Sequence, residues 1–86
     1  MKFEVLLERK AEQDLKKLPD NIYSRIIKTL HKLSQNPLPN GSRKITGSVN
    51  DWRVRVGDYR IVYEVLRKEK EVRVMRIRHR KNVYRT

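Results

Sequence analysis

The stretch DWRVRVGDYRIVYEVL, residues 51–66, contains the pattern from which the fold is most clearly predicted. Its first half alternates apolar and charged residues from Trp52 to Val56, which is the period-two pattern of a strand with one buried face. Gly57-Asp58 then forms a tight turn, and YRIVYEVL (59–66) follows as a second strand. The stretch therefore predicts an antiparallel hairpin whose valine face packs on a core.

Two further strands are predicted on either side of this hairpin. RKITG (43–47) is a short strand before it, and EVRVMRIRHR (71–80) is the last strand, after a charged turn. In the last strand the apolar parity switches between Val74 and Met75, which either a bulge or burial on both faces would explain. The four strands together predict an antiparallel meander.

The N-terminal half predicts one strand and two helices. KFEVLL (2–7) alternates like a half-buried strand, and RKAEQDLKKL (9–18) places its apolar side chains on one helical stripe. The next helix is NIYSRIIKTLHKLSQ (21–35), with Asp20 as the expected N-cap, and NPLPNG (36–41) ends it as a surface turn.

Aromatic and histidine residues in these elements are assigned by their periodicity. In the second helix Ile27 is expected to widen the apolar stripe and His31 to lie on the surface. The aromatic residues are expected in or at the edge of the core, because Trp52 shares its strand face with valines; they are Tyr23, Trp52, Tyr59 and Tyr63.

The length and the net charge of the chain predict one small basic domain. Residues 1–86 allow a single core, so we predict one α+β domain: a strand, a two-helix hairpin, then a curled antiparallel four-strand meander packed on the helices. The net charge is +12, and 14 of the 22 basic residues follow Ser42, against 5 of the 10 acidic ones. This charge favours a polyanionic partner such as nucleic acid, an anionic membrane or an acidic protein.

Several classes of protein are excluded or disfavoured by composition. The chain has no cysteine, so disulfides and thiolate metal sites are impossible, and we expect no metal or cofactor. No apolar run is long enough to span a bilayer. In MKFEVLLERK (1–10) charged residues occur too early to leave the apolar segment that a signal peptide needs. Neither helix is both strongly basic and strongly amphipathic, so no membrane partner is expected. The prediction is a soluble, cytoplasmic protein.

Arginines gather on successive strands of the predicted sheet. Arg53 and Arg55 share a face, the tight turn brings Arg60 near them, and the last strand adds arginines of one parity, Arg76, Arg78 and Arg80. A single strand arginine is usually solvated surface. Like charges on neighbouring strands destabilise a sheet, however, so the cluster predicts a concave site for a bound anion.

His79 has two interpretations. Its ordinary pKa near neutrality suits a general acid or base. Its strand parity is opposite to that of the flanking arginines, which favours a packing or hydrogen-bonding role.

Over nearly its whole length the chain resembles RelE-type toxins of the RelE/ParE superfamily. The resemblance rests on LKKLP in the helix hairpin, KITG in the short strand, the run GDYRIVYEV and the closing RHRKNVYR. It implies the RelE-like RNase fold, cleavage of mRNA in the ribosomal A site, and neutralisation by an antitoxin that wraps the toxin. The implied partners are a RelB-type antitoxin in a hetero-oligomer and the ribosome with its mRNA and small-subunit rRNA; the free toxin is not expected to form homo-oligomers.

The resemblance also implies site residues. Carried over by position, the catalytic set is Arg53, Arg55, Arg60, Arg80 and Tyr84. Lys44, Arg76, Arg78, Lys81 and Arg85 are the expected RNA-binding residues. Some members carry lysine where this chain has the Arg53 and Arg55 pair, and because arginine stays charged it is a poor proton acceptor.

The sequence is also compatible with two other functions. A ParE-type member of the superfamily would inhibit DNA gyrase and cleave no RNA, and such members generally lack the arginine cluster with its tyrosine. A non-enzymatic RNA-binding or ribosome-binding module would need the basic sheet and no catalytic tyrosine.

Overall fold

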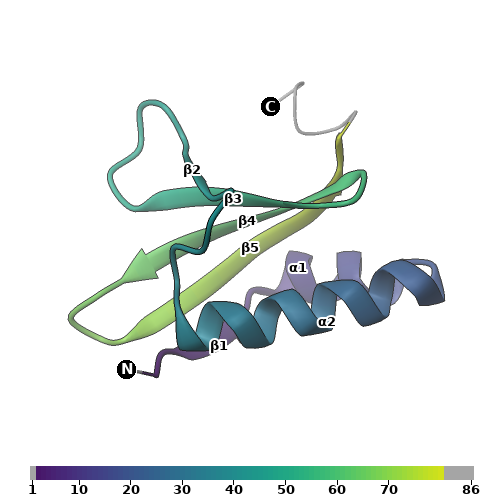
Figure 1. Ribbon diagram of the computed structural model, residues 1–86, viewed down its shortest axis with the longest axis horizontal. Coiled ribbons are helices and arrows are strands. Elements are labelled where there is room, and N and C mark those ends of the chain that lie inside the picture. Colours follow the sequence, from purple (N-terminus) through teal and green to yellow (C-terminus); the bar gives the residue numbers. More distant parts are fainter. Residues whose placement is uncertain (1, 81–86) are drawn as a thin grey trace.

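The computed structural model describes residues 2–80, in which two helices cover one face of a twisted five-stranded sheet (Figure 1). The elements are β1 (Glu4–Leu7), α1 (Arg9–Lys16), α2 (Asp20–Gln35), β2 (Arg43–Lys44), β3 (Asp51–Val56), β4 (Tyr59–Leu66) and β5 (Glu71–His79). The predicted α+β class, helix hairpin and strands are confirmed. Within the described part, no helix is long and apolar enough to cross a membrane.

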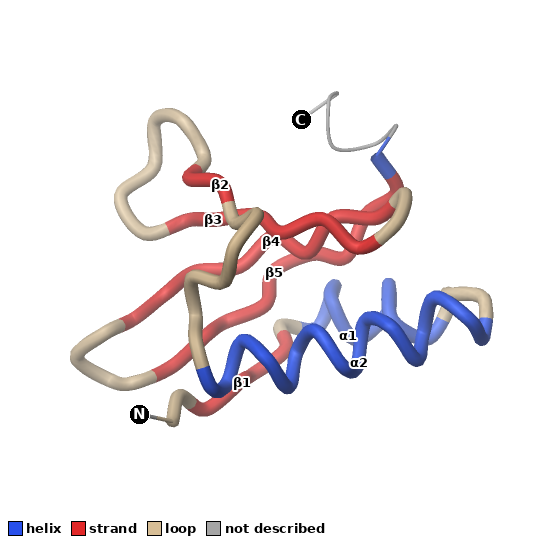
Figure 2. The backbone as a smooth tube through the Cα atoms, viewed as in Figure 1, coloured by secondary structure: helices blue, strands red, loops and turns tan. Residues whose placement is uncertain are grey.

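The sheet has the order β1-β5-β4-β3-β2. Strands β2 to β5 form the predicted antiparallel meander, and Figure 2 shows them passing above the two helices. The N-terminal β1 joins the other edge of the meander by pairing in parallel with β5, from Glu4 opposite Glu71 to Leu7 opposite Val74. The first and last strands of the chain are therefore neighbours.

A bulge in β5 explains the switch of its apolar parity. Val62 of β4 pairs with Arg76, whereas the next residue, Tyr63, pairs with Val74, so Met75 is the extra residue. One added residue in a strand turns every later side chain to the other face relative to the original alternation. As a result both Val74 and Ile77 point into the core.

The core lies between the helices and the valine face of the sheet. Its buried side chains come from both helices and from β3, β4 and β5; they are Ala11, Ile26, Leu30, Leu33, Val54, Val56, Ile61, Tyr63, Val65, Val72, Val74 and Ile77. Trp52 and Tyr59 are partly buried against this cluster, as their parity predicted. The opposite face of the sheet carries charged residues of β3, β4 and β5, among them Arg53, Arg60 and Arg73.

Tyr63 ties the loop after α2 to the centre of the sheet. Its side chain is fully buried, and its hydroxyl donates a 2.7 Å hydrogen bond to the carbonyl oxygen of Pro37. Burial raises the pKa of Tyr63 to about 12, although the hydrogen bond with Ser42 lowers it. The residue is therefore a neutral structural group and takes no part in the basic surface.

Three local predictions for α2 are wrong. Asp20 is the first residue inside the helix, and the N-cap is Pro19, which makes no side-chain cap; the Asp20 charge instead lies in the first turn, where the helix dipole favours it. Tyr23 and Ile27 are 43% and 40% exposed, and neither belongs to the hydrophobic residues that pack on the core. His31 is exposed as expected.

Candidate functional site

A row of three arginines crosses the sheet on the face away from the helices. Arg55 of β3 pairs with Arg60 of β4, and Arg60 pairs with Arg78 of β5. Their sequence neighbours Val54, Val56 and Ile61 point into the core, so the three arginine side chains leave on the other face. This arrangement places three positive charges on directly opposed positions, which costs stability unless an anion neutralises them.

Four arginines line a single pocket beside this row. The pocket has a volume of about 320 Å³, and its lining residues are Gly41, Arg43, Arg53, Arg55 and Arg60. Three of these arginines, Arg53, Arg55 and Arg60, belong to the cluster that the sequence predicted. The other three members of that cluster, Arg76, Arg78 and Arg80, do not line this pocket. The sequence did not predict that Arg43 lines this pocket. Strand β2 is only two residues long, so the face on which the Arg43 side chain lies is set by its pairing with Arg53.

The turn between β3 and β4 holds Arg55 in place. Its Nε donates a 2.8 Å hydrogen bond to the carbonyl oxygen of Gly57. Gly57 has a φ of 60°, a left-handed conformation that glycine adopts without strain and that closes a tight hairpin. The turn thus fixes the register that sets Arg55 opposite Arg60 and orients the Arg55 guanidinium as well.

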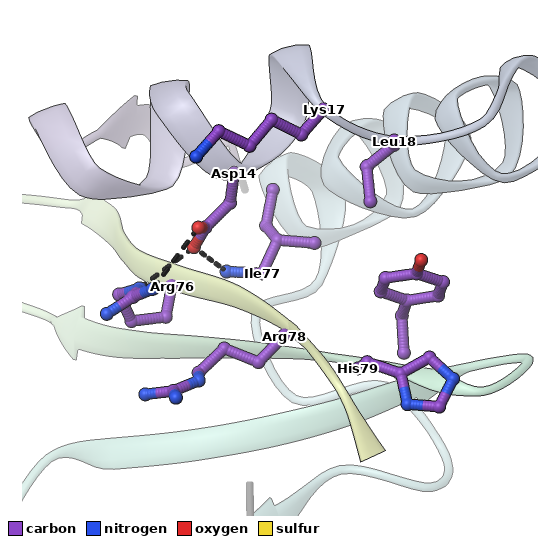
Figure 3. A pocket seen from close by; sticks show the side chains of 8 residues that line it. Asp14, Lys17, Leu18, Arg76, Ile77, Arg78 and His79 are labelled. Carbon is purple, nitrogen blue, oxygen red and sulfur yellow. Dashed lines mark hydrogen bonds and ion pairs between the residues drawn. The ribbon is translucent and has the colours of Figure 1, made fainter. Parts of the chain in front are cut away.

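Asp14 of α1 binds Arg76 and the backbone of β5 (Figure 3). The Arg76 guanidinium donates to both carboxylate oxygens, at 2.8 and 3.2 Å, and the Ile77 N–H donates to Asp14 Oδ2 at 2.9 Å. Because β1 pairs with β5 only as far as Val74, the carboxylate binds an N–H beyond the end of β1. Arg76 is therefore engaged in an ion pair and does not line the arginine pocket.

Asp14 is expected to contribute measurably to stability. Burial opposes its ionisation, but the hydrogen bonds from Arg76 and Ile77 outweigh this and lower its pKa below 3.8. Asp14→Ala would leave a charged group and a backbone N–H without their partner, which costs about 1–3 kcal/mol. Because the pKa of Asp14 is lowered in the folded state, this stabilisation is complete above pH 3.8 and is lost as the pH falls through the folded-state value.

Urea unfolding measures this contribution. At pH 6 the free energy of unfolding should be lower for Asp14→Ala than for wild type, and the difference between the two proteins should be smaller at pH 3. Gln13→Ala, an exposed and uncharged change on the same helix, should shift stability by no more than about 0.5 kcal/mol at either pH. Equal effects of the two substitutions would contradict the assignment.

His79 packs against an aromatic ring on the helix-facing side of the sheet. Its ring centroid lies 5.2 Å from that of Tyr59, edge to face at 85°. Together with Asp14, Lys17 and Arg78, both rings line a second pocket of about 190 Å³ between α1 and β5, shown in Figure 3. On the opposite face of β5, the Nε of Arg78 is buried and has no hydrogen-bond partner among the described residues.

The remaining predicted site residues lie at the margins. The backbone N–H of Arg80 donates to the Asp58 carbonyl oxygen at 2.7 Å, and its exposed guanidinium lies 3.9 Å from the Asp58 carboxylate, so β5 ends beside the β3–β4 turn. Lys44 pairs with Trp52 and so falls on the other strand parity from Arg43 and Arg53. Lys81, Tyr84 and Arg85 lie outside the described residues.

The chemistry available to the arginine pocket is that of anion binding. Among residues 2–80, its lining contains four guanidinium groups and no carboxylate or imidazole. Guanidinium forks bind phosphate oxygens through two parallel hydrogen bonds. In the same residues, no three carboxylate or imidazole side chains lie close enough to hold a metal ion. The pocket is thus suited to a phosphate group.

Comparison with known proteins gives one consistent family. A family model of the ParE toxin of the type II toxin–antitoxin system parDE matches residues 5–84. The chain is 36% identical over 84 residues to toxin RelE3 of Methanocaldococcus jannaschii, covering 93% of each protein.

Solved structures agree with this result. The chain is similar to a chain of the RelB–RelE antitoxin–toxin complex from Methanococcus jannaschii, with 31% identity, a TM-score of 0.77 and coverage of 92% of this chain and 94% of the other. It is also similar to a chain of the RelBE2 complex from Mycobacterium tuberculosis, with 25% identity, a TM-score of 0.82 and coverage of 92% and 99%. The chain therefore belongs to the RelE/ParE superfamily of toxins from type II toxin–antitoxin systems.

Proposed function

We propose that this toxin is a ribosome-dependent endoribonuclease, an mRNA interferase that cleaves the message in the ribosomal A site and so inhibits translation. The observation that supports this most directly is the pocket in which Arg43, Arg53, Arg55 and Arg60 converge without a carboxylate. A relative named RelE3 that matches over 93% of the chain supports the same class.

Cleavage without a metal requires three tasks at one phosphate. The ribose 2′-hydroxyl loses its proton to water as its oxygen bonds to the adjacent phosphorus, the phosphorane gains negative charge, and the bond from phosphorus to the 5′-oxygen breaks as that oxygen takes up a proton. Arg53 and Arg60 are assigned to the scissile phosphate and Arg55 to the 2′-oxygen or the phosphate, because preorganised positive charge stabilises the phosphorane. Arg80 is assigned to the leaving oxygen and Tyr84 to orienting or stacking on a base.

The ribosome is expected to position the message for cleavage, an effect that these side chains do not provide alone. The described lining of the pocket consists of Gly41 and four arginines, which do not accept a proton at neutral pH. Holding the message in an in-line geometry contributes several kcal/mol to catalysis through orientation alone. The toxin should therefore cleave free RNA slowly and ribosome-bound message much faster.

An antitoxin of the RelB type is the proposed partner in the cell. Two structural relatives were solved as complexes of RelB and RelE proteins. With a net charge of +12, this toxin would be neutralised by an acidic or amphipathic segment that covers the arginine pocket and pairs its guanidinium groups.

A gyrase inhibitor is the second candidate function. The description of the matching family model as a ParE toxin supports it. A protein that inhibits gyrase by binding needs no cluster of arginines around a phosphate-sized pocket, which is why we favour cleavage of RNA.

Induction of the toxin in bacteria, with primer extension on a translated message, tests the proposal. We expect new 5′ ends at codon-spaced positions only in translated regions, and growth rescued by the protein encoded next to the toxin. Inhibited growth with every message intact would contradict it.

Binding should depend steeply on salt. If the four pocket arginines each contact one phosphate, the slope of log K against log salt is about −3, because each contact on a single strand contributes roughly 0.7. Filter binding of an uncleavable message to the toxin between 50 and 200 mM salt measures this slope. A flat dependence would show that the arginine pocket is not the binding surface.

A further inference from the structure

A stripe of basic side chains on α2 lies next to the site and takes no part in the mechanism above. Arg25, Lys28 and Lys32 are all exposed, and their spacing puts them along one side of the helix. With Thr29, Arg55 and Val56 they line a pocket of about 230 Å³ between α2 and the end of β3. We call Arg25, Lys28 and Lys32 the α2 stripe.

The α2 stripe is continuous with the arginine pocket. Arg55 lines both pockets, so positive charge extends from the open face of the sheet, around the end of β3, to the helix layer. The lining residues that the structure describes in the two pockets include no acidic side chain. In residues 2–80 the ion pairs are Arg73–Glu71, Arg76–Asp14 and Arg80–Asp58, and none of them involves the stripe or Arg55.

The spacing and polarity of the stripe fit a nucleic-acid backbone better than a folded protein. Its three charges span about 10 Å of helix, which is roughly the length over which one strand presents three phosphates. A protein interface would need an apolar centre. Here the only apolar lining residue, Val56, is already buried in the core, and the exposed Tyr23 and Ile27 fall on nearly the opposite side of α2.

We propose that the α2 stripe is a second RNA-binding surface, which contacts the sugar-phosphate backbone of the strand that enters the arginine pocket or of adjacent ribosomal RNA. The inference rests on the proposed function for the identity of its RNA. Contacts to phosphate carry no sequence information, so the stripe would set affinity and register and leave codon choice to other residues.

The test compares two triple variants with the same loss of charge. Arg25→Gln/Lys28→Gln/Lys32→Gln removes the stripe, and Arg9→Gln/Lys10→Gln/Lys16→Gln removes three exposed charges from α1. Dissociation constants are measured for ribosomes carrying a message with a 2′-O-methyl group at the A-site codon, and for the same message alone, at several salt concentrations. Melting temperatures are compared first, and only variants that melt like the parent are used.

Loss of three phosphate contacts should weaken binding by about 10²-fold at 0.1 M salt and make the salt slope shallower by about 2, from roughly 0.7 per contact. The α1 variant should change affinity by less than about threefold, because none of its three residues lines the arginine pocket or the pocket of the stripe and exposed charges are screened by salt. A defect seen with free message assigns the stripe to the message, and a defect seen only with ribosomes assigns it to ribosomal RNA.

Equal losses in the two variants would overturn the proposal, because they would show only an effect of net charge. Unchanged RNA affinity with weakened antitoxin binding would overturn it too, by making the stripe a protein-docking surface. If wild type leaves ribosome-bound message intact but the stripe variant still loses RNA affinity, the proposed cleavage fails while the RNA-binding surface stands.

Discussion

Replacing Arg60 with alanine is expected to lower single-turnover cleavage on programmed ribosomes by about 10²–10³-fold, the usual effect of removing one preorganised donor from a developing oxyanion. Arg60 lies at the centre of the arginine row, opposite both Arg55 and Arg78, and it lines the pocket. Because it contacts the phosphate in the ground state as well, binding should weaken together with the rate.

Two control variants isolate the role of Arg60. Arg67→Ala also removes one positive charge, but from the exposed turn between β4 and β5, which contributes no arginine to the arginine pocket. This variant should cleave at the parental rate. Arg60→Lys keeps the charge but loses the planar fork, so it should recover binding better than rate. An Arg60→Ala protein that folds and cleaves like wild type would contradict the assignment of Arg60 to the scissile phosphate.

Arg80→Ala and Tyr84→Ala are each expected to reduce the cleavage rate by about 10²-fold or more while ribosome binding changes little, because a group that acts mainly in the transition state affects the rate rather than the affinity. Arg80 is exposed at the end of β5, so its replacement should shift stability by no more than about 0.5 kcal/mol.

Asp58→Asn is the matched control for Arg80. It removes the 3.9 Å charge contact with Arg80 but leaves the guanidinium in place. An exposed pair of this kind contributes about 0–1 kcal/mol, so Asp58→Asn should keep both stability and cleavage near the parental values. Parental cleavage rates in both Arg80→Ala and Tyr84→Ala would show that neither residue acts on the reaction.

Local sequence patterns predicted the meander well because they determine it directly. The alternation from Trp52 to Val56 and the glycine turn after it set the register of β3 and β4, and this register places Arg55 opposite Arg60. The parity switch at Met75 was compatible with a bulge or with burial on both faces, and the register of β4 and β5 shows that a bulge causes it. These features depend only on neighbouring residues and on a period of two.

Features that depend on distant residues were not predictable from one sequence. The parallel pairing of β1 with β5 joins strands at the two ends of the chain, and no local pattern signals it. The contact of Asp14 with Arg76 links residues 62 positions apart, so parity alone could not show that Arg76 is engaged by α1. Arg43 joined the pocket through a strand too short to show any alternation.

Purified components can show whether the toxin cleaves ribosome-bound message through its arginine pocket. Wild-type toxin is mixed at equal concentrations with programmed ribosomes, with the same free message and with DNA gyrase acting on relaxed plasmid, and cleavage and supercoiling are followed in parallel. We expect a single cut in the A-site codon on ribosomes, much slower cleavage of free message and normal supercoiling. Intact message on the ribosome together with inhibited gyrase would contradict this expectation.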